Sequence, residues 1–187
     1  MTELSLPEKV TEIDKRLKEA RVPHAFGGAL ALAYYGEPRA TIDIDVNVFV
    51  STSRIDEINE ALGPLGVGTI DAEDDRAALE RDDQCRLWWG NTAVDLFFSY
   101  DEVHEAMSKN TRRVPFGEEA FDILSPEHLV FCKACFDRVK DWLDIEQVLV
   151  AVEQFDVEEV DRWLLHIVGP DDHRKRRFDE LVTELRE

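Results

Sequence analysis

The chain has 187 residues, 44% of them hydrophobic, which is enough to bury a substantial core as one domain or as two small lobes. Its 41 acidic and 22 basic residues leave a formal net charge of −19, which argues against a broad surface for nucleic acid or another polyanion. A nucleotide or nucleic acid would therefore have to be bound by a local patch or through metal ions.

No apolar run approaches membrane-spanning length, and residues 1–10 lack the basic and hydrophobic regions of a signal peptide. We therefore expect a cytoplasmic protein with no membrane partner. The three cysteines, an odd number, fit reduced thiols better than a disulfide framework. No second pair or histidine cluster completes a zinc site with Cys132 and Cys135, so we expect these to be two small residues on one helix face.

The beginning of the chain predicts a helix, a short strand and a second helix. Apolar residues recur with helical spacing over 6–20, so an amphipathic helix opens the fold. Residues 21–26 read as a strand that ends at Gly27 and Gly28, and residues 29–35 read as a helix. Glycine lets the backbone approach an anion closely, and the unpaired N–H groups of a first helical turn favour phosphate. Both glycines are therefore candidate phosphate contacts, although tight turns use such pairs constantly.

Residues 40–50 carry the strongest signal in the chain. Apolar and β-branched residues occupy every second position, which predicts a strand. Asp43, Asp45 and Asn47 then share one face, with the two carboxylates about 7 Å apart at Cα. Such a pair is stable when a cation neutralises it, and its oxygen ligands suit Mg²⁺ or Mn²⁺. The alternative is a solvated strand face that carries two aspartates.

A hairpin follows further along the chain. Residues 53–62 predict a surface helix, and the acidic stretch 71–83 predicts a solvated helix or loop. Residues 85–98 then read as two strands joined by a two-residue Gly-Asn turn. Asp95 lies among apolar neighbours in the second strand, where a carboxylate is costly unless it is paired or bound to metal. It is the natural third carboxylate beside the other two, and an edge-strand aspartate that faces solvent is the alternative.

The remainder of the chain, from residue 122 onward, reads as helical. Ser125 begins a helix, and Asp156 and Asp171 are expected to cap the last two helices. Lys133 lies in an otherwise apolar run, and we expect its ammonium to have no partner until an anion binds. The basic cluster 173–177 is either a contact for RNA or an acidic partner, or a solvated helix start.

These residues resemble the nucleotidyltransferase fold of the DNA polymerase β superfamily. The resemblance is carried by the glycine pair, Tyr34-Tyr35-Gly36, Pro38-Arg39-x-Thr41, Asp43-x-Asp45 and Val94-Asp95-Leu96. A helical lysine followed by Arg138-x-Lys140-Asp141-x-x-Asp144 is similar to the AbiEii-like group of nucleotidyltransferase toxins, which includes the MenT toxins. Together these motifs cover about residues 20–150. Many superfamily members have Gly-Ser where this chain has Gly-Gly, so one hydroxyl that would contact a phosphate is missing.

The resemblance implies an α/β (α+β) fold with a mixed-sheet nucleotidyltransferase domain over 1–122 and a C-terminal helical domain over 123–187. It also implies an active site in the cleft between the two. The catalytic residues it implies are Asp43, Asp45, Asp95, Lys133, Asp141 and Asp144, of which the first three would hold metal. The nucleotide contacts it implies are Gly27, Gly28, Arg39, Lys133 and Arg138. An ordinary salt-bridged helix surface is the alternative for Lys140 and Asp141.

The activity implied is transfer of a nucleoside monophosphate from a nucleoside triphosphate to a hydroxyl, with Mg²⁺ or Mn²⁺ and release of pyrophosphate. By resemblance the acceptor is the 3′ end of a tRNA, and a cognate antitoxin is the protein partner. A hydroxylated antibiotic of the aminoglycoside type is an alternative acceptor that suits the acidic surface better. A catalytically silent nucleotide-binding domain is a further alternative, which the three carboxylates disfavour.

Overall fold

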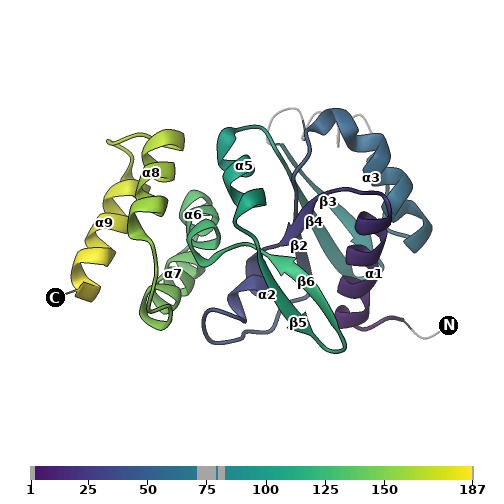
Figure 1. Cartoon of the computed structure of the whole chain (residues 1–187), viewed down its shortest axis with the longest axis horizontal. Helices are drawn as coiled ribbons and strands as arrows, with labels where there is room; N and C mark the ends of the chain where they lie inside the picture. Colours follow the sequence, from purple (N-terminus) through teal and green to yellow (C-terminus); the bar gives the residue numbers. More distant parts are fainter. Residues whose placement is uncertain (1–2, 71–78, 80–82, 187) are drawn as a thin grey trace. The chain divides into compact units, whose positions relative to one another are not determined.

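The computed structural model describes residues 3–70, 79 and 83–186, and it divides the chain into two compact units (Figure 1). The first unit comprises residues 1–27 and 40–123, and the second comprises residues 28–39 and 124–187. The boundary expected from the sequence lay one residue earlier and left residues 28–39 in the first domain. This segment belongs with the helices because α2 (Gly28–Leu32) packs on α6 (Pro126–Phe136). Most of the acidic stretch 71–83 lies outside the described residues.

A six-stranded mixed sheet forms the first unit. Its strands lie in the order β3 (Gln84–Trp89), β4 (Thr92–Phe98), β2 (Asp43–Val48), β1 (His24–Phe26), β6 (Glu119–Ile123) and β5 (Arg112–Phe116). β2 is parallel to β4 and β1 is parallel to β6, whereas the other neighbours are antiparallel. The predicted fold class is confirmed, and so is the hairpin, whose tight turn has Gly90 at a φ of 61°.

Strand register separates an apolar face of the sheet from a polar one. On β2, Ile44 and Val46 alternate with the aspartates and lie beside Val94 and Leu96 of β4. The next strand, β3, adds Leu87 and Cys85 to the same rows. All of these side chains are buried, so the alternating pattern of the sequence builds the core on one face and leaves polar residues on the other.

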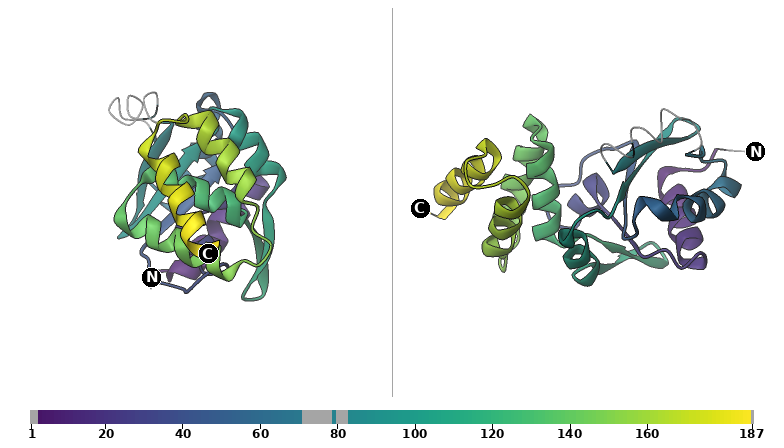
Figure 2. Two further views of the ribbon diagram at one scale, coloured as in Figure 1. Left: turned by 90° about the vertical axis from the view of Figure 1, so that its left-hand side faces the viewer. Right: turned by 90° about the horizontal axis from the view of Figure 1, so that it is seen from above.

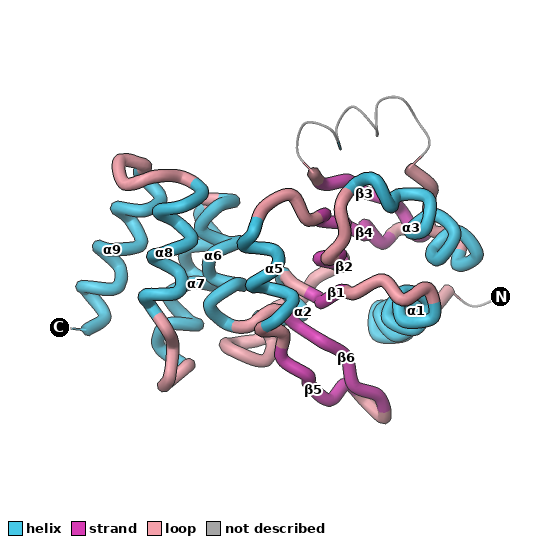
Figure 3. Tube along the Cα trace, turned by 45° about the horizontal axis from the view of Figure 1, so that its top comes forward, coloured by secondary structure: helices cyan, strands magenta, loops and turns pink. Residues whose placement is uncertain are grey.

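The described residues of the first unit include the helices α1 (Leu6–Glu19), α3 (Ile55–Leu62) and α5 (Glu102–Lys109). α1 begins with a capping box between Ser5 and Glu8 and buries the apolar stripe that predicted it. α1 and α3 pack side by side, as both Figure 1 and Figure 3 show. Short 3₁₀ turns, Thr52–Arg54 and Gly63–Leu65, flank α3.

The second unit is helical. Besides α2 and α6 it contains α7 (Val139–Ala151), α8 (Val157–Ile167) and α9 (His173–Arg186). Figure 2 shows α8 and α9 side by side. Ser125 accepts a hydrogen bond from the His128 N–H and Asp156 accepts one from the Glu159 N–H, which confirms both predicted caps. The cap expected at Asp171 was wrong by one residue, because the Asp172 carboxylate accepts the Arg174 N–H.

The three cysteines are free thiols, as expected. Burial raises the pKa of the Cys135 thiol to about 11, which disfavours the reactive thiolate at neutral pH. None of the described helices combines the length and the apolar composition that crossing a bilayer requires.

Candidate active site

Three aspartates lie on the polar face of the sheet, opposite the apolar core. Asp43 and Asp45 flank the buried Ile44 on β2, and Asp95 is the direct partner of Asp45 in the parallel ladder with β4. Side chains of paired residues on neighbouring strands point to the same face. The register therefore puts all three carboxylates on one face, as a shared metal site requires.

The antiparallel ladder adds an arginine to these carboxylates. Arg86 on β3 is the partner of Asp95, so a guanidinium follows two carboxylates across three adjacent strands. Its Nε and Nη2 each donate to a different oxygen of Asp95, both at 2.7 Å. These hydrogen bonds, and the charges of Asp43 and Asp45 more weakly, raise the pKa of the guanidinium. The carboxylate row, defined as Asp43, Asp45, Asp95 and Arg86, thus carries one internal cation.

The carboxylate row has the donor chemistry that a hard divalent cation requires. Carboxylate oxygens are the ligands that Mg²⁺ and Mn²⁺ prefer. Three aspartates and one arginine give the row a formal net charge of −2, and a bound cation would relieve the repulsion among the carboxylates. In the part of the chain that the structure describes, no three acidic, cysteine or histidine side chains are already grouped closely enough to hold a metal. Asp43 and Asp45 fit a metal in their chemistry, whereas both oxygens of Asp95 are engaged by Arg86.

The glycine pair fits the expected phosphate role only in part. The Gly27 N–H donates to the Asp45 carbonyl at 2.9 Å and is therefore not available to a phosphate. The expectation of two backbone donors is thus corrected for Gly27, whose role is to join β1 to β2. Gly28 has a φ of 51°, in the left-handed region, where a side chain is strained.

This backbone conformation makes Gly28 a stability determinant in its own right. We expect Gly28→Ala to lower the free energy of unfolding by about 1–2 kcal/mol, the usual cost of a left-handed conformation for an L-residue. Gly63→Ala is the matched control, because Gly63 has a φ of −51° and no atom lies within 4 Å of an added Cβ. Urea denaturation of both variants checks this. Equal stability of the two would mean that Gly28 tolerates a side chain, and the phosphate role would then be testable by substitution.

A buried ionic network joins α6 to α7 in the second unit. The Lys133 ammonium donates to Asp144 at 2.6 Å and lies 3.7 Å from Asp141. Arg39 reaches Asp144 at 3.4 Å, and Arg138 donates to both oxygens of Asp141 at 2.5 and 3.2 Å. We call these five residues, Arg39, Lys133, Arg138, Asp141 and Asp144, the ionic network. All five were predicted as site residues, and the structure brings them together.

One expectation about the ionic network was wrong, and one alternative for Asp141 is excluded. Lys133 has partners within the chain itself, because the acidic positions of α7 face α6. Asp141 does not belong to a salt-bridged helix surface, since its side chain is 0% exposed. The network contains three cations and two carboxylates, so it carries one surplus positive charge. The side chains of Arg39 and Arg138 are 37% and 54% exposed, and this surplus is therefore accessible to an anion from solvent.

The basic cluster 173–177 is largely neutralised by acids of its own unit. The His173 ring forms a hydrogen bond with Asp137, and ion pairs join Arg174 to Asp172, Lys175 to Asp161 and Asp179, and Arg177 to Asp137. Paired cations bind phosphates less readily than unpaired ones, because an existing bond must be replaced. The solvated helix start is therefore the better interpretation of this cluster.

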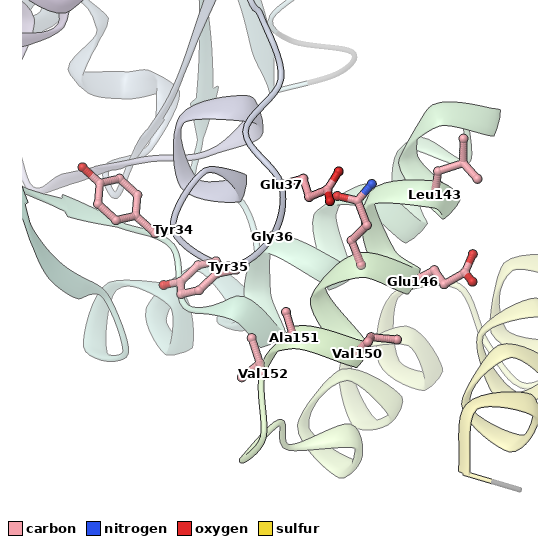
Figure 4. A pocket seen from close by; sticks show the side chains of 10 residues that line it. Tyr34, Tyr35, Gly36, Glu37, Leu143, Glu146, Val150, Ala151 and Val152 are labelled. Carbon is pink, nitrogen blue, oxygen red and sulfur yellow. The ribbon is translucent and has the colours of Figure 1, made fainter.

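A hollow of about 730 Å³ lies in the second unit, between the turn after α2 and α7 (Figure 4). Its lining includes Glu37 and Glu146, two acids that no motif singled out. The Tyr35 hydroxyl fixes the turn by donating to the Leu124 carbonyl at 2.8 Å. The Gln147 Oε1 is buried with no hydrogen-bond partner among the described residues. This lining suits a ligand that brings positive charge and hydrogen-bond donors.

Known proteins match this chain in structure. No protein-family model matches the chain, and no curated protein matches its sequence. The solution structure of the antibiotic-resistance factor ANT(2'')-Ia has a TM-score of 0.62 at 15% identity, over 99% of this chain and 97% of that chain. The crystal structure of ANT(2'')-Ia in complex with adenylyl-2''-tobramycin gives 0.58 at 16% identity, over 93% and 97%. The lincomycin-bound lincosamide antibiotic adenylyltransferase LnuA gives 0.52 at 10% identity, over 81% and 100%.

At these identities the matches establish the fold and not the activity. The narrower resemblance to AbiEii-like toxins stays a prediction. With its six-stranded mixed sheet and C-terminal helices, the chain has the fold of polymerase-β-like nucleotidyltransferases.

Proposed function

We propose that this protein is a metal-dependent nucleotidyltransferase that transfers a nucleoside monophosphate from a nucleoside triphosphate to a hydroxyl and releases pyrophosphate. The observation that carries the proposal is the carboxylate row. Like charges directly opposite each other on neighbouring strands destabilise a sheet, and Asp45 and Asp95 are such a pair. A sheet face that is merely exposed to solvent gains nothing from two opposed carboxylates, whereas a metal site requires carboxylates close together.

In this proposal the three aspartates of the carboxylate row bind the metal ion. Asp43 and Asp45 would hold Mg²⁺ or Mn²⁺, and Asp95 would complete the position. Such a metal, when bound, supplies charge stabilisation for the triphosphate and favours deprotonation of the acceptor hydroxyl. The aspartates of this chain fix where that charge lies and keep the oxygens at one face of a rigid sheet.

Within the second unit, the ionic network is the candidate group for binding phosphate. Arg39 and Arg138 are the members that solvent reaches, and guanidinium groups bind phosphate oxygens through charge-assisted hydrogen bonds. Lys133 is 4% exposed and holds Asp141 and Asp144, so we assign it a positioning role rather than the direct phosphate contact expected from the sequence. The two buried aspartates in turn orient the two arginines.

Two acceptors are carried forward. The resemblance to AbiEii-like toxins favours the 3′ end of tRNA, with an antitoxin that restrains the activity. The net charge of −19, the neutralised basic cluster and the hollow lined by Glu37 and Glu146 favour a small cationic acceptor. The antibiotic nucleotidyltransferases among the structural matches support this second acceptor.

One experiment tests both proposals. Purified protein is incubated with Mg²⁺, each labelled nucleoside triphosphate in turn, and either total tRNA or a panel of hydroxylated cationic antibiotics. We expect metal-dependent transfer of label to one acceptor class and none after chelation with EDTA. Label in tRNA would support the toxin assignment, label in an antibiotic the small-molecule assignment. Absence of nucleotide binding and transfer with every pair would contradict the enzymatic proposal.

A further inference from the structure

The pair between Arg86 and Asp95 has a feature that a simple structural ion pair does not need. Asp95 is 15% exposed and accepts two hydrogen bonds from a guanidinium that is 52% exposed. The same two oxygens belong to the third carboxylate of the candidate metal site. Asp95 therefore has two potential cationic partners, the Arg86 guanidinium and the divalent ion of the candidate site.

A divalent cation at this carboxylate would compete with the guanidinium. Each oxygen keeps a second lone pair, but a divalent ion bound there would lie beside the guanidinium, with strong repulsion between like charges at a half-buried position. Arg86 sits at the end of the row, on β3, and its side chain is 52% exposed, so solvent can hydrate the guanidinium if the pair with Asp95 breaks.

We propose that Arg86 is an internal counterion, which holds Asp95 in the metal-free protein and releases it when a divalent cation binds to the carboxylate row. Arg86 thereby stabilises the row without metal and lowers its affinity for metal. The proposal rests on the proposed function, because it requires that the row binds a divalent ion.

A second arginine–aspartate pair in the same sheet provides a matched control. Arg113 and Asp122 are cross-strand partners on β5 and β6, with the guanidinium 3.4 Å from the carboxylate. Arg113 is 53% exposed, nearly the same as Arg86, but it lies outside the carboxylate row. Arg113→Gln changes the net charge as Arg86→Gln does and leaves the row intact.

The test is a titration with Mn²⁺, followed by calorimetry and by the melting temperature, for the full-length protein and three variants. We expect Arg86→Gln to tighten the Mn²⁺ dissociation constant about tenfold, which corresponds to about 1.4 kcal/mol. Arg113→Gln should change it less than about twofold. Arg86→Lys keeps the charge but loses the bidentate grip, so its affinity should lie between those of wild type and Arg86→Gln. In EDTA, Arg86→Gln should melt below wild type, and Mn²⁺ should raise its melting temperature more.

Each outcome bears on a different statement. Equal Mn²⁺ affinity for wild type, Arg86→Gln and Arg86→Lys would overturn the proposal and make Arg86 a structural ion pair only. Equal tightening by Arg113→Gln would overturn it as well, because net charge alone would then explain the effect. If neither wild type nor any variant binds Mn²⁺, the metal-dependent function fails together with this inference.

Discussion

Replacing Lys133 by alanine should destabilise the protein severely. The substitution leaves Asp141 and Asp144, which are 0% and 4% exposed, without the ammonium that lies between them. Removing one partner of a buried ion pair usually costs about 3–5 kcal/mol, because the remaining charge stays buried. Arg39 and Arg138 still contact the two carboxylates, so we expect a loss near the lower end, about 3 kcal/mol. Urea denaturation followed by circular dichroism measures this loss.

Lys140→Ala is the control for this experiment. Lys140 is an exposed residue on α7 beside Asp141, and its removal should change the free energy of unfolding by no more than about 0.5 kcal/mol. If Lys133→Ala proved as stable as Lys140→Ala, the ionic network would not hold the helices together. A large loss has a consequence for function, because inactivity of Lys133→Ala would then reflect unfolding. Substitution of the half-exposed Arg39 or Arg138 by glutamine is the cleaner test of phosphate binding.

The fold was predictable to a large extent because its signals are local. Period-two alternation over 40–50 predicts β2 and also which side of it faces the core. The two-residue turn at Gly90 and Asn91 fixes the register of β3 against β4. Counting outward from that turn pairs Trp89 with Thr92 and Arg86 with Asp95, as the structure shows. The arginine of the carboxylate row was therefore within reach of sequence reasoning, and the neglected signal was the hairpin register.

Long-range packing was not predictable in the same way. The partners of Lys133 depend on how α6 and α7 pack, which no local pattern specifies. The commitment of the Gly27 N–H to the Asp45 carbonyl depends on the pairing of β1 with β2. The pocket beside α7 combines two segments about a hundred residues apart, and no local pattern predicts that they meet. These features follow from tertiary contacts, so the motifs predict candidate site residues without predicting their partners.

Replacing Asp43 by asparagine should strongly reduce nucleotide transfer while the fold remains stable. A metal contributes several kcal/mol of charge stabilisation to such a reaction, and each 1.4 kcal/mol corresponds to a tenfold change in rate. We therefore expect transfer to fall by about 10²–10³-fold, and the rise in melting temperature on addition of Mn²⁺ to disappear. The amide keeps the size of the side chain and removes one of the three negative charges on this face of the sheet, so stability in EDTA should not fall.

Loss of transfer and of the Mn²⁺ response without loss of stability in EDTA distinguishes a functional aspartate from a structural one. Asp122→Asn is the matched control, since Asp122 lies on β6 of the same sheet and pairs only with the half-exposed Arg113 among the ion pairs of the described residues. That variant should keep full transfer and the full response to Mn²⁺, and lose no more than about 0.5 kcal/mol. A structural role for Asp43 would show the reverse, with reduced stability in EDTA and an unchanged response to Mn²⁺. Transfer by Asp43→Asn at the wild-type rate would remove the carboxylate row from the active site, because asparagine cannot neutralise a divalent cation as aspartate does.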